Sequence, residues 1–354
     1  PYYLSSQIDE ANVYTVSPEA LAARGVKLRL GQRASRLDRA AQRLLLEGGD
    51  SVEYDDLLIA TGSSAVRPPL PGIDGARVYD HWTLADTQAL RQLVGPGAEV
   101  ALIGAGFIAF TLVNPLLHAG CKLTLIEREP QVLPRMLNHE AAAILEGWLA
   151  EHGVQVLTGA NLRRIEDTPD GTKRLTIDHP RLTTHNARLV IVATGIRPNL
   201  EWLRDSGLTI GQGLIVDQHL HTNDPGIYAA GDVAEITDAV TGERTVMAIE
   251  TAAMEQGRLV GAAMAGQPKY YAGGLAMNVI EAAGLQAASF GQWAGAEATD
   301  GRAAGGHYRH YVWNGDRLVG GVIVGPARQV AGENDMGLLK GLVQAGQPLG
   351  PWKQ

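Results

Sequence analysis

The sequence of 354 residues contains one cysteine, Cys121, which excludes an internal disulfide and any Cys-x-x-Cys redox or zinc pair. We interpret Cys121 as a buried, unreactive thiol. A basic surplus is also absent, because Lys and Arg total 30 against 38 Asp and Glu, and this argues against a nucleic-acid partner. No apolar run approaches the ~18 residues of a membrane span, and Pro1–Ser6 lacks the pattern of a secretory signal. We therefore expect a cytoplasmic protein that binds neither nucleic acid nor membrane.

Glycine is abundant, with 43 residues in the chain, or about 12% against a usual ~7%. Many of these glycines follow short apolar runs of the kind that form strands buried on both faces of a parallel sheet. The runs are Asp56–Ala60, Glu99–Ile103, Lys122–Ile126, Arg188–Ala193 and Gly226–Ala230. Helical patterns at Thr83–Leu93 and Asn138–His152 lie between them. The sequence therefore predicts an α/β fold with parallel sheets.

The last third of the chain has a different pattern. His307–Val324 consists of two alternating runs around Asn314-Gly315, which predicts a β-hairpin. We expect a mostly antiparallel domain from Lys269 onward. His307 and His310 are a weak candidate pair of metal ligands, but the alternating faces of a strand explain them better, so no metal site is predicted.

The strongest chemical signal is Val100–Glu127, which reads as a strand, a glycine turn, a helix and a second strand that ends in an acid. The turn, Gly104-Ala105-Gly106-Phe107-Ile108-Ala109, is the G-x-G-x-x-A form of the dinucleotide fingerprint. Gly104 permits the tight bend, Gly106 lets a pyrophosphate approach the helix N-terminus, and Ala109 keeps the helix close to the strand. The alternative is a glycine turn that merely packs.

Glu127 lies about 20 residues after the glycines, where a carboxylate accepts hydrogen bonds from the adenosine ribose. It favours NADH over NADPH, because a carboxylate repels the additional phosphate of NADPH. Arg128 follows directly and is able to bind that phosphate, so NADPH stays open as the less favoured cofactor.

A second unit, Thr222–Asp232, delivers Gly231 and Asp232 to the C-terminal end of a strand, where ligands bind in α/β proteins. A carboxylate in that place accepts hydrogen bonds from a sugar-type hydroxyl. The alternative is an ordinary aspartate that caps a turn, and spacing alone does not separate the two.

The order of these motifs resembles a known family. Ala60-Thr61-Gly62, Gly104–Ala109, Ala193–Asn199 and Thr222–Asp232 look like the motifs of the FAD-dependent pyridine nucleotide–disulfide oxidoreductases, and Ala252–Gly257 looks like that family's A-x-x-Q-G helix start. The resemblance covers nearly the whole chain. It is closest to the branch of rubredoxin reductases, the flavin segment of assimilatory nitrite reductases, NADH oxidases and coenzyme A disulfide reductases.

The resemblance implies two Rossmann-like nucleotide-binding domains and a C-terminal α+β domain. An FAD domain, residues 1–96 and 211–265, is split around an inserted NAD(P) domain, residues 97–210. An interface domain at residues 266–354 follows, and it implies a homodimer.

The resemblance also implies roles for single residues. Asp232 binds the FAD ribityl chain, and the helix of Gln256 points its N-terminus at the flavin pyrimidine. FAD contacts are implied for Ala60, Thr61, Gly62, Gly231, Asp232, Glu255 and Gln256, and NAD contacts for Gly104, Gly106, Phe107, Ile108, Ala109, Glu127, Arg128 and Gly195. No catalytic acid or base is implied.

The chain departs from the family pattern in ways that bear on function. No G-x-G-x-x-G turn for the FAD pyrophosphate lies before Asp56, which favours a fragment over a natural loss of that lobe. Thr111 stands where the family usually carries a glutamate near the nicotinamide. Pro115 lies inside the nucleotide helix, where we expect it to bend the helix at a cost of about 3 kcal/mol.

Four aromatic residues leave two interpretations open. Tyr2 and Tyr3 either line the open face of the flavin or pack in the core. Trp293 and Trp313 are expected to pack in the C-terminal domain or at a dimer interface, rather than to contact a substrate.

These patterns predict an NADH-dependent flavoprotein oxidoreductase, in which NADH passes a hydride to FAD and FAD passes electrons to an acceptor. Without a cysteine pair, the acceptor takes electrons directly from the flavin. A small redox protein of the iron–sulfur or rubredoxin type is one expected partner, and oxygen is another. The alternatives are a non-catalytic nucleotide-binding or assembly subunit that has lost FAD, and a flavin site completed by another chain.

Overall fold

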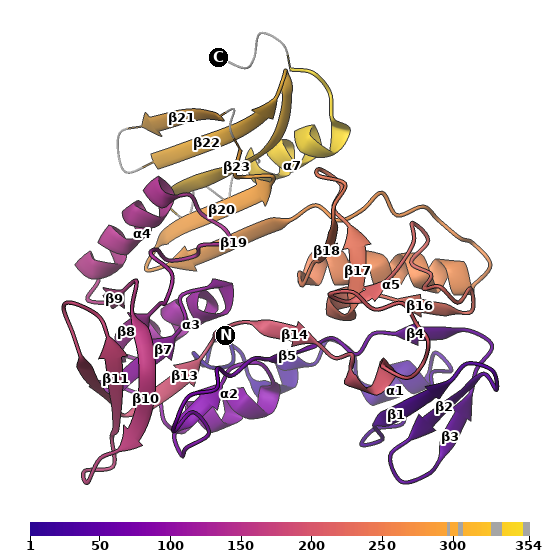
Figure 1. Cartoon of the computed structure of the whole chain (residues 1–354), viewed down its shortest axis with the longest axis horizontal. Coiled ribbons are helices and arrows are strands. Elements are labelled where there is room, and N and C mark those ends of the chain that lie inside the picture. Colours follow the sequence, from indigo (N-terminus) through magenta and orange to yellow (C-terminus); the bar gives the residue numbers. More distant parts are fainter. Residues whose placement is uncertain (296–297, 304–306, 327–334, 350–354) are drawn as a thin grey trace. The chain divides into compact units, whose positions relative to one another are not determined.

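The computed structural model describes residues 1–295, 298–303, 307–326 and 335–349 (Figure 1). The chain forms two compact units. The first unit consists of Pro1–Ile8, Ala65–Ile196 and Met277–Gln354, and the second unit consists of Asp9–Ser64 and Arg197–Ala276. The short strands β5 (Ser63–Ala65) and β14 (Ile196–Pro198) lie where the chain passes from one unit to the other.

The first unit is built around a parallel sheet of five strands in the order β6-β13-β7-β8-β9. Every residue of β13 is buried, and only the first residue of β7 and of β8 is exposed. The bounds are β6 (Val78–Asp80), β7 (Glu99–Ile103), β8 (Lys122–Ile126), β9 (Gln155–Leu157) and β13 (Leu189–Val192). The parallel strands predicted from the apolar runs are confirmed, together with the α/β class.

The helices of the first unit begin where their capping residues predict. Thr83 and Asp86 form a capping box at the start of α2 (Leu84–Arg91). The side chain of Asn138 accepts a hydrogen bond from the Ala141 N–H at the start of α4 (His139–Glu151). Between them, α3 (Phe107–His118) begins at the glycine turn.

Two antiparallel sheets complete the first unit. One has the order β10-β11-β12 and the other, after residue 276, has the order β19-β20-β23-β22-β21. The predicted hairpin is confirmed, with a loop at Gly315-Asp316 between its paired ends Asn314 and Arg317. The bounds are β10 (Asn161–Asp167), β11 (Lys173–Asp178), β12 (Thr184–Ala187), β19 (Met277–Ala282), β20 (Leu285–Gly291), β21 (Ala298–Ala303), β22 (His307–Asn314), β23 (Arg317–Pro326) and α7 (Asp335–Ala345).

Polar side chains join the last antiparallel sheet to the nucleotide helices. The Ala283 N–H donates to Asn114 Oδ1 of α3 at 2.7 Å, and Trp148 Nε1 of α4 donates to the Ala283 carbonyl at 3.0 Å. Asn138 Nδ2 donates to the hydroxyl of the fully buried Tyr308 at 2.6 Å. In addition, buried apolar residues of the C-terminal sheet and of the parallel sheet belong to one hydrophobic core.

The second unit has shorter strands. Its parallel pair is β4 (Leu57–Ile59) with β16 (Ile227–Ala229), and β16 leads into Gly231 and Asp232. The other elements are η1 (Glu10–Val13), α1 (Pro18–Ala22), β1 (Ala34–Asp38), β2 (Arg43–Leu46), β3 (Ser51–Glu53), η2 (Glu201–Leu203), β15 (Leu214–Ile215), η3 (Gly231–Val233), β17 (Ala234–Thr237), β18 (Arg244–Val246) and α5 (Glu250–Met264).

The predicted division into three domains stays a prediction, because the compact units group residues by contact and not by ancestry or independent folding. Within the described residues, no helix is both long and apolar enough to cross a membrane.

Candidate nucleotide-binding sites

The turn after β7 requires glycine at position 104. Gly104 has φ +94°, and a Cβ at this position would lie 2.5 Å from the Ala193 carbonyl oxygen at the end of β13. The Gly104 N–H donates to the Ile126 carbonyl at the end of β8 at 2.8 Å. The turn is therefore clamped between the two strands that neighbour β7, at the carboxyl edge of the parallel sheet.

The glycine turn leads directly into the N-terminus of α3, which has no side-chain cap. Gly106 is the N-cap, no side chain caps the helix, and a Cβ at Gly106 would meet no atom within 4 Å. Phe107 is 43% exposed and Ala109 is fully buried. Because the first N–H groups of a helix lack intrahelical partners and carry partial positive charge, this end fits an anion such as a pyrophosphate.

Glu127 is held by the turn that it follows. Its Oε2 accepts a hydrogen bond from the Ala105 N–H at 2.6 Å, and its Oε1 accepts one from the Glu129 N–H at 2.8 Å. The residue is only 8% exposed. Glu127 thus fixes the middle of the glycine turn, a structural role that spacing did not indicate. The predicted contact with a ribose stays a prediction.

Gly195 lies just after β13 and has φ +127°. Its carbonyl accepts a hydrogen bond from the Val66 N–H at 2.9 Å, and the neighbouring Thr194 Oγ1 donates to the Val66 carbonyl at 2.6 Å. The strand order places β13 next to β7, so Gly195 and Gly104 follow neighbouring strands on the same edge of the sheet.

The unusual residues of α3 are accommodated within the helix. Thr111 Oγ1 donates to the Ile108 carbonyl at 2.7 Å, so its hydroxyl is occupied by its own helix. Pro115 is buried and α3 continues through it to His118. Proline removes one helical N–H donor at this position.

In the second unit, Asp232 is held by Ser63, and the turn just before it is held by Gln256. Ser63 Oγ donates to Asp232 Oδ2 at 2.6 Å, and the preceding Gly231 N–H donates to Gln256 Oε1 at 2.7 Å. Gln256 is 1% exposed, and its Nε2 donates to the Tyr271 hydroxyl at 3.2 Å. Burial raises the pKa of Tyr271. This arrangement leaves a carboxylate at the end of β16 that fits a polyhydroxyl chain.

The segment Ala60–Gly62 follows β4 and is clasped by Asn199. Asn199 Nδ2 donates to the Thr61 carbonyl at 2.8 Å, and the Asn199 N–H donates to the Gly62 carbonyl at 3.0 Å. Ser64 Oγ donates to Asn199 Oδ1 at 2.7 Å. Because β4 and β16 are parallel neighbours, the Thr61 segment and Asp232 follow the same edge of that sheet.

The Ala252–Gly257 motif lies in the first two turns of α5 and begins two residues after the helix does. Helix α5 begins at Glu250, so Gln256 lies inside the helix, in its second turn. Glu255 is exposed on the same helix, while Gln256 faces the Gly231 turn.

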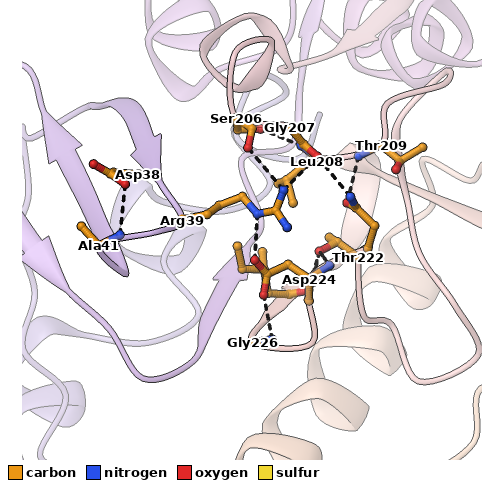
Figure 2. A network of polar contacts seen from close by, with 12 residues as sticks. Asp38, Arg39, Ala41, Ser206, Gly207, Leu208, Thr209, Thr222, Asp224 and Gly226 are labelled. Atoms are coloured by element: carbon orange, nitrogen blue, oxygen red, sulfur yellow. Dashed lines mark hydrogen bonds and ion pairs between the residues drawn. The ribbon is translucent and has the colours of Figure 1, made fainter.

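A polar network holds the loop that precedes β16 (Figure 2). Arg39 Nε donates to Asp224 Oδ2 at 2.7 Å, and Arg39 Nη1 donates to the Gly207 carbonyl at 2.9 Å. Asp224 Oδ1 accepts from the Gly226 N–H at 3.2 Å. The network fixes the entry into β16 and so the strand that carries Asp232 at its end.

Sequence reasoning missed three residues that shape the second site, namely Ser63, Asn199 and Tyr271. Ser63 follows Ala60–Gly62 directly, and Asn199 ends the motif that begins at Ala193, so both had a signal of adjacency. Tyr271 had none, because its contact with Gln256 depends on the path of the chain after α5.

The other residues considered in the sequence analysis are the single cysteine, the candidate metal ligands and four aromatic side chains. Cys121 is buried, as predicted, and burial raises the pKa of its thiol, which favours the unreactive interpretation. Within the described residues, no cluster of three His, Cys, Asp or Glu side chains is arranged to hold a metal ion. Tyr3 lies beneath the Arg91 guanidinium, 4.2 Å from ring centroid to Cζ, whereas Tyr2 is 65% exposed. Trp293 and Trp313 both pack against neighbouring residues.

These sites define a dinucleotide-binding protein with a second polar site on a second parallel sheet. Residues 5–257 match the family described as pyridine nucleotide-disulphide oxidoreductase, and the chain belongs to that family.

Three curated relatives illustrate the range of this similarity. The chain is 32% identical over 293 residues to the NADH-dependent phenylglyoxylate dehydrogenase subunit epsilon of Aromatoleum evansii, covering 82% of this chain and 69% of that protein. It is 34% identical over 224 residues to an NADH oxidase of Methanocaldococcus jannaschii, covering 62% and 49%. It is 32% identical over 247 residues to the biphenyl dioxygenase system ferredoxin–NAD(+) reductase component of Paraburkholderia xenovorans, covering 70% and 60%. The chain thus spans about half to two thirds of their length.

Solved structures agree with this assignment. The fold superposes on an NAD-dependent persulfide reductase from A. fulgidus with a TM-score of 0.86 and 27% identity, covering 98% of this chain and 69% of that one. It superposes on an FAD-dependent pyridine nucleotide-disulphide oxidoreductase from Desulfovibrio vulgaris with a TM-score of 0.73 and 27% identity, covering 83% and 78%. The predicted family, the fold class, and the class of FAD- and NADH-dependent oxidoreductases are confirmed at the level of the family.

Proposed function

We propose that this chain binds NADH at the carboxyl edge of its five-stranded sheet. We propose further that it acts as an oxidoreductase that passes electrons from NADH, by way of FAD, to a separate acceptor. The observation that carries the proposal is the turn at Gly104. Gly104 has a positive φ and lies close to Ala193, and Glu127 holds the next residue of the turn, Ala105, through its N–H. This geometry leaves the start of α3 open to an anion. The pyrophosphate of NADH fits this place, and Glu127 follows the neighbouring strand where a ribose is expected.

The second unit supplies residues suited to FAD. Asp232 is held by Ser63 and by the turn at Gly231, and Ala60–Gly62 follows the neighbouring strand. We assign the ribityl hydroxyls to Asp232, and contacts along Ala60, Thr61 and Gly62 to the same cofactor. When bound in this place, FAD would supply the hydride-accepting and electron-transferring chemistry between NADH and the acceptor. The protein's part is to bind and orient the two cofactors.

A small redox protein is the acceptor that we propose. The name of the Paraburkholderia xenovorans relative identifies it as a ferredoxin–NAD(+) reductase component. The chain has one buried cysteine, so a cysteine pair of its own does not relay electrons. A homodimer is part of the same proposal.

The alternative is a nucleotide-binding subunit of a larger enzyme, with a flavin site that another chain completes. The name of the Aromatoleum evansii relative describes a subunit, which favours this alternative. Thr111 favours it as well, because its hydroxyl is occupied within α3 and carries no charge for a nicotinamide.

The test is reduction of the protein-bound flavin. The purified protein is reconstituted with FAD, separated from free FAD, and mixed with NADH in the absence of oxygen. We expect the visible flavin bands to bleach and to return on addition of an oxidised ferredoxin. Retention of NADH without retention of FAD selects the subunit alternative. Failure to bind either cofactor contradicts the proposal.

A further inference from the structure

The residues that follow β8 form a charged triplet, Glu127-Arg128-Glu129. Glu127 is almost fully buried, and both of its carboxylate oxygens accept backbone hydrogen bonds, from Ala105 and from Glu129. The side chain therefore cannot turn away from the glycine turn without giving up these bonds. Its negative charge is a fixed part of the edge where the adenosine ribose is proposed to lie.

Arg128 points its guanidinium at Glu129. Arg128 Nη2 lies 2.9 Å from Glu129 Oε1, and Nε lies 3.3 Å from the same oxygen. The Arg128 side chain is 78% exposed and that of Glu129 is 44% exposed. The one cation of the triplet is thus occupied by a carboxylate of its own segment.

We propose that Glu129 is a specificity-determining residue that makes this chain select NADH over NADPH by occupying Arg128. The inference rests on the proposed binding of NADH at this edge. A 2′-phosphate is an anion that arginine binds well through paired N–H donors. Here it meets the fixed charge of Glu127 and must also displace Glu129 from the arginine. Glu129 acts through Arg128, so it is a positioning residue and not a contact to the cofactor.

The substitution Glu129→Gln tests this role because it keeps the size of the side chain and removes its charge. The probes are 5′-AMP and adenosine 2′,5′-bisphosphate, which differ only in the 2′-phosphate, and the readout is equilibrium binding by calorimetry. We expect the affinity for the bisphosphate to rise about threefold to fivefold, the scale of an exposed ion pair, while that for 5′-AMP changes less than about twofold. The gain should shrink as salt is added, since the site is exposed.

Glu166→Gln is the matched control. Glu166 is also 44% exposed and also pairs with a nearby arginine, Arg164, at 3.1 Å, but on β10. This variant should leave the affinities for both probes unchanged. The double variant Arg128→Ala/Glu129→Gln should lose the gain in bisphosphate affinity, because the released arginine is its source.

The outcomes separate this inference from the proposed function. Equal changes for the two probes, or a gain that survives Arg128→Ala, overturn the role of Glu129. If the wild-type chain binds neither 5′-AMP nor NADH, the proposed nucleotide site itself is wrong.

Discussion

Gly104 and Gly231 stand at the same kind of place, because each follows a parallel strand and has a positive φ, +94° and +74°. Their surroundings differ. A Cβ at Gly104 would lie 2.5 Å from a backbone oxygen, whereas a Cβ at Gly231 would meet only the Ala253 methyl at 3.5 Å. The first site is shaped by backbone packed against backbone, and the second by side chains brought from elsewhere in its unit.

The difference shows two ways of building a nucleotide site. At Gly104 the proposed anion site is formed by N–H groups of one continuous strand–turn–helix, and Glu127 holds the turn through the Ala105 N–H. At Gly231 the geometry depends on Ser63 and Gln256, which are distant in sequence. We expect the first site to be intolerant of backbone change and the second to be sensitive to side-chain substitution.

Gly104→Ala should have the largest effect. An alanine at this φ costs about 1–2 kcal/mol, and overpacking adds about 1–3 kcal/mol because the atom that it meets is backbone. Gly231→Ala carries only the first cost, about 1–2 kcal/mol. Urea denaturation of the two variants measures the difference. Equal losses of unfolding free energy would break the comparison.

His81 follows β6 at the carboxyl edge of the parallel sheet in the first unit. Burial lowers the pKa of His81 to about 4. The unfolded chain has an ordinary histidine pKa near 6.5 and so binds more protons than the folded chain between pH 6.5 and 4. The unfolding free energy should therefore fall as the pH drops through this window, by about 2–3 kcal/mol at pH 4.

His81→Gln removes this titration while keeping a polar group near Thr87, whose Oγ1 lies 3.4 Å from His81 Nε2. The difference in stability between wild type and variant, measured by urea denaturation at several pH values, isolates the His81 contribution. Parallel curves across the window would show that His81 is not held neutral by burial.

Gln256→Leu tests the side-chain construction of the second site. It leaves the Gly231 N–H and the buried Tyr271 hydroxyl without their partner, at a cost of about 2 kcal/mol. We expect weaker retention of FAD and unchanged binding of NADH. Arg258→Gln, an exposed change on the same helix, is the control and should alter neither stability nor FAD retention.

Arg39→Lys should have the smallest effect. Lysine keeps the charge beside Asp224 but cannot also reach the Gly207 carbonyl in the fork-like manner of arginine. We expect a loss of about 1 kcal/mol in unfolding free energy, since one hydrogen bond disappears. Arg43→Lys, in the more exposed pair with Glu53, should cost less than about 0.5 kcal/mol. Equal losses would show that the network of Figure 2 is not special.

The first site could be predicted from the sequence because its parts are local. The strand, the turn at Gly104–Ala109, the helix and Glu127 follow one another, and each has a recognisable pattern. The N-caps of α2 and α4, Thr83 and Asn138, could likewise be predicted from local sequence. The hydrogen bonds that Glu127 accepts from the Ala105 and Glu129 N–H groups could not be predicted, because sequence spacing does not show which donors a carboxylate oxygen meets.

The second site could be predicted only in part. The Thr222–Asp232 motif was visible, but the contacts of Ser63 with Asp232 and of Asn199 with Thr61 join distant segments. These contacts depend on the pairing of β4 with β16, and no local sequence pattern predicts which two strands pair.

The most direct test compares cofactor binding in Gly104→Ala and Gly231→Ala. Each purified variant is titrated with NADH, and its FAD content after reconstitution is measured from the flavin absorbance. The account predicts that Gly104→Ala loses NADH binding and that Gly231→Ala keeps it while retaining less FAD. Loss of NADH binding in Gly231→Ala alone would contradict the assignment of the two cofactors to these two turns.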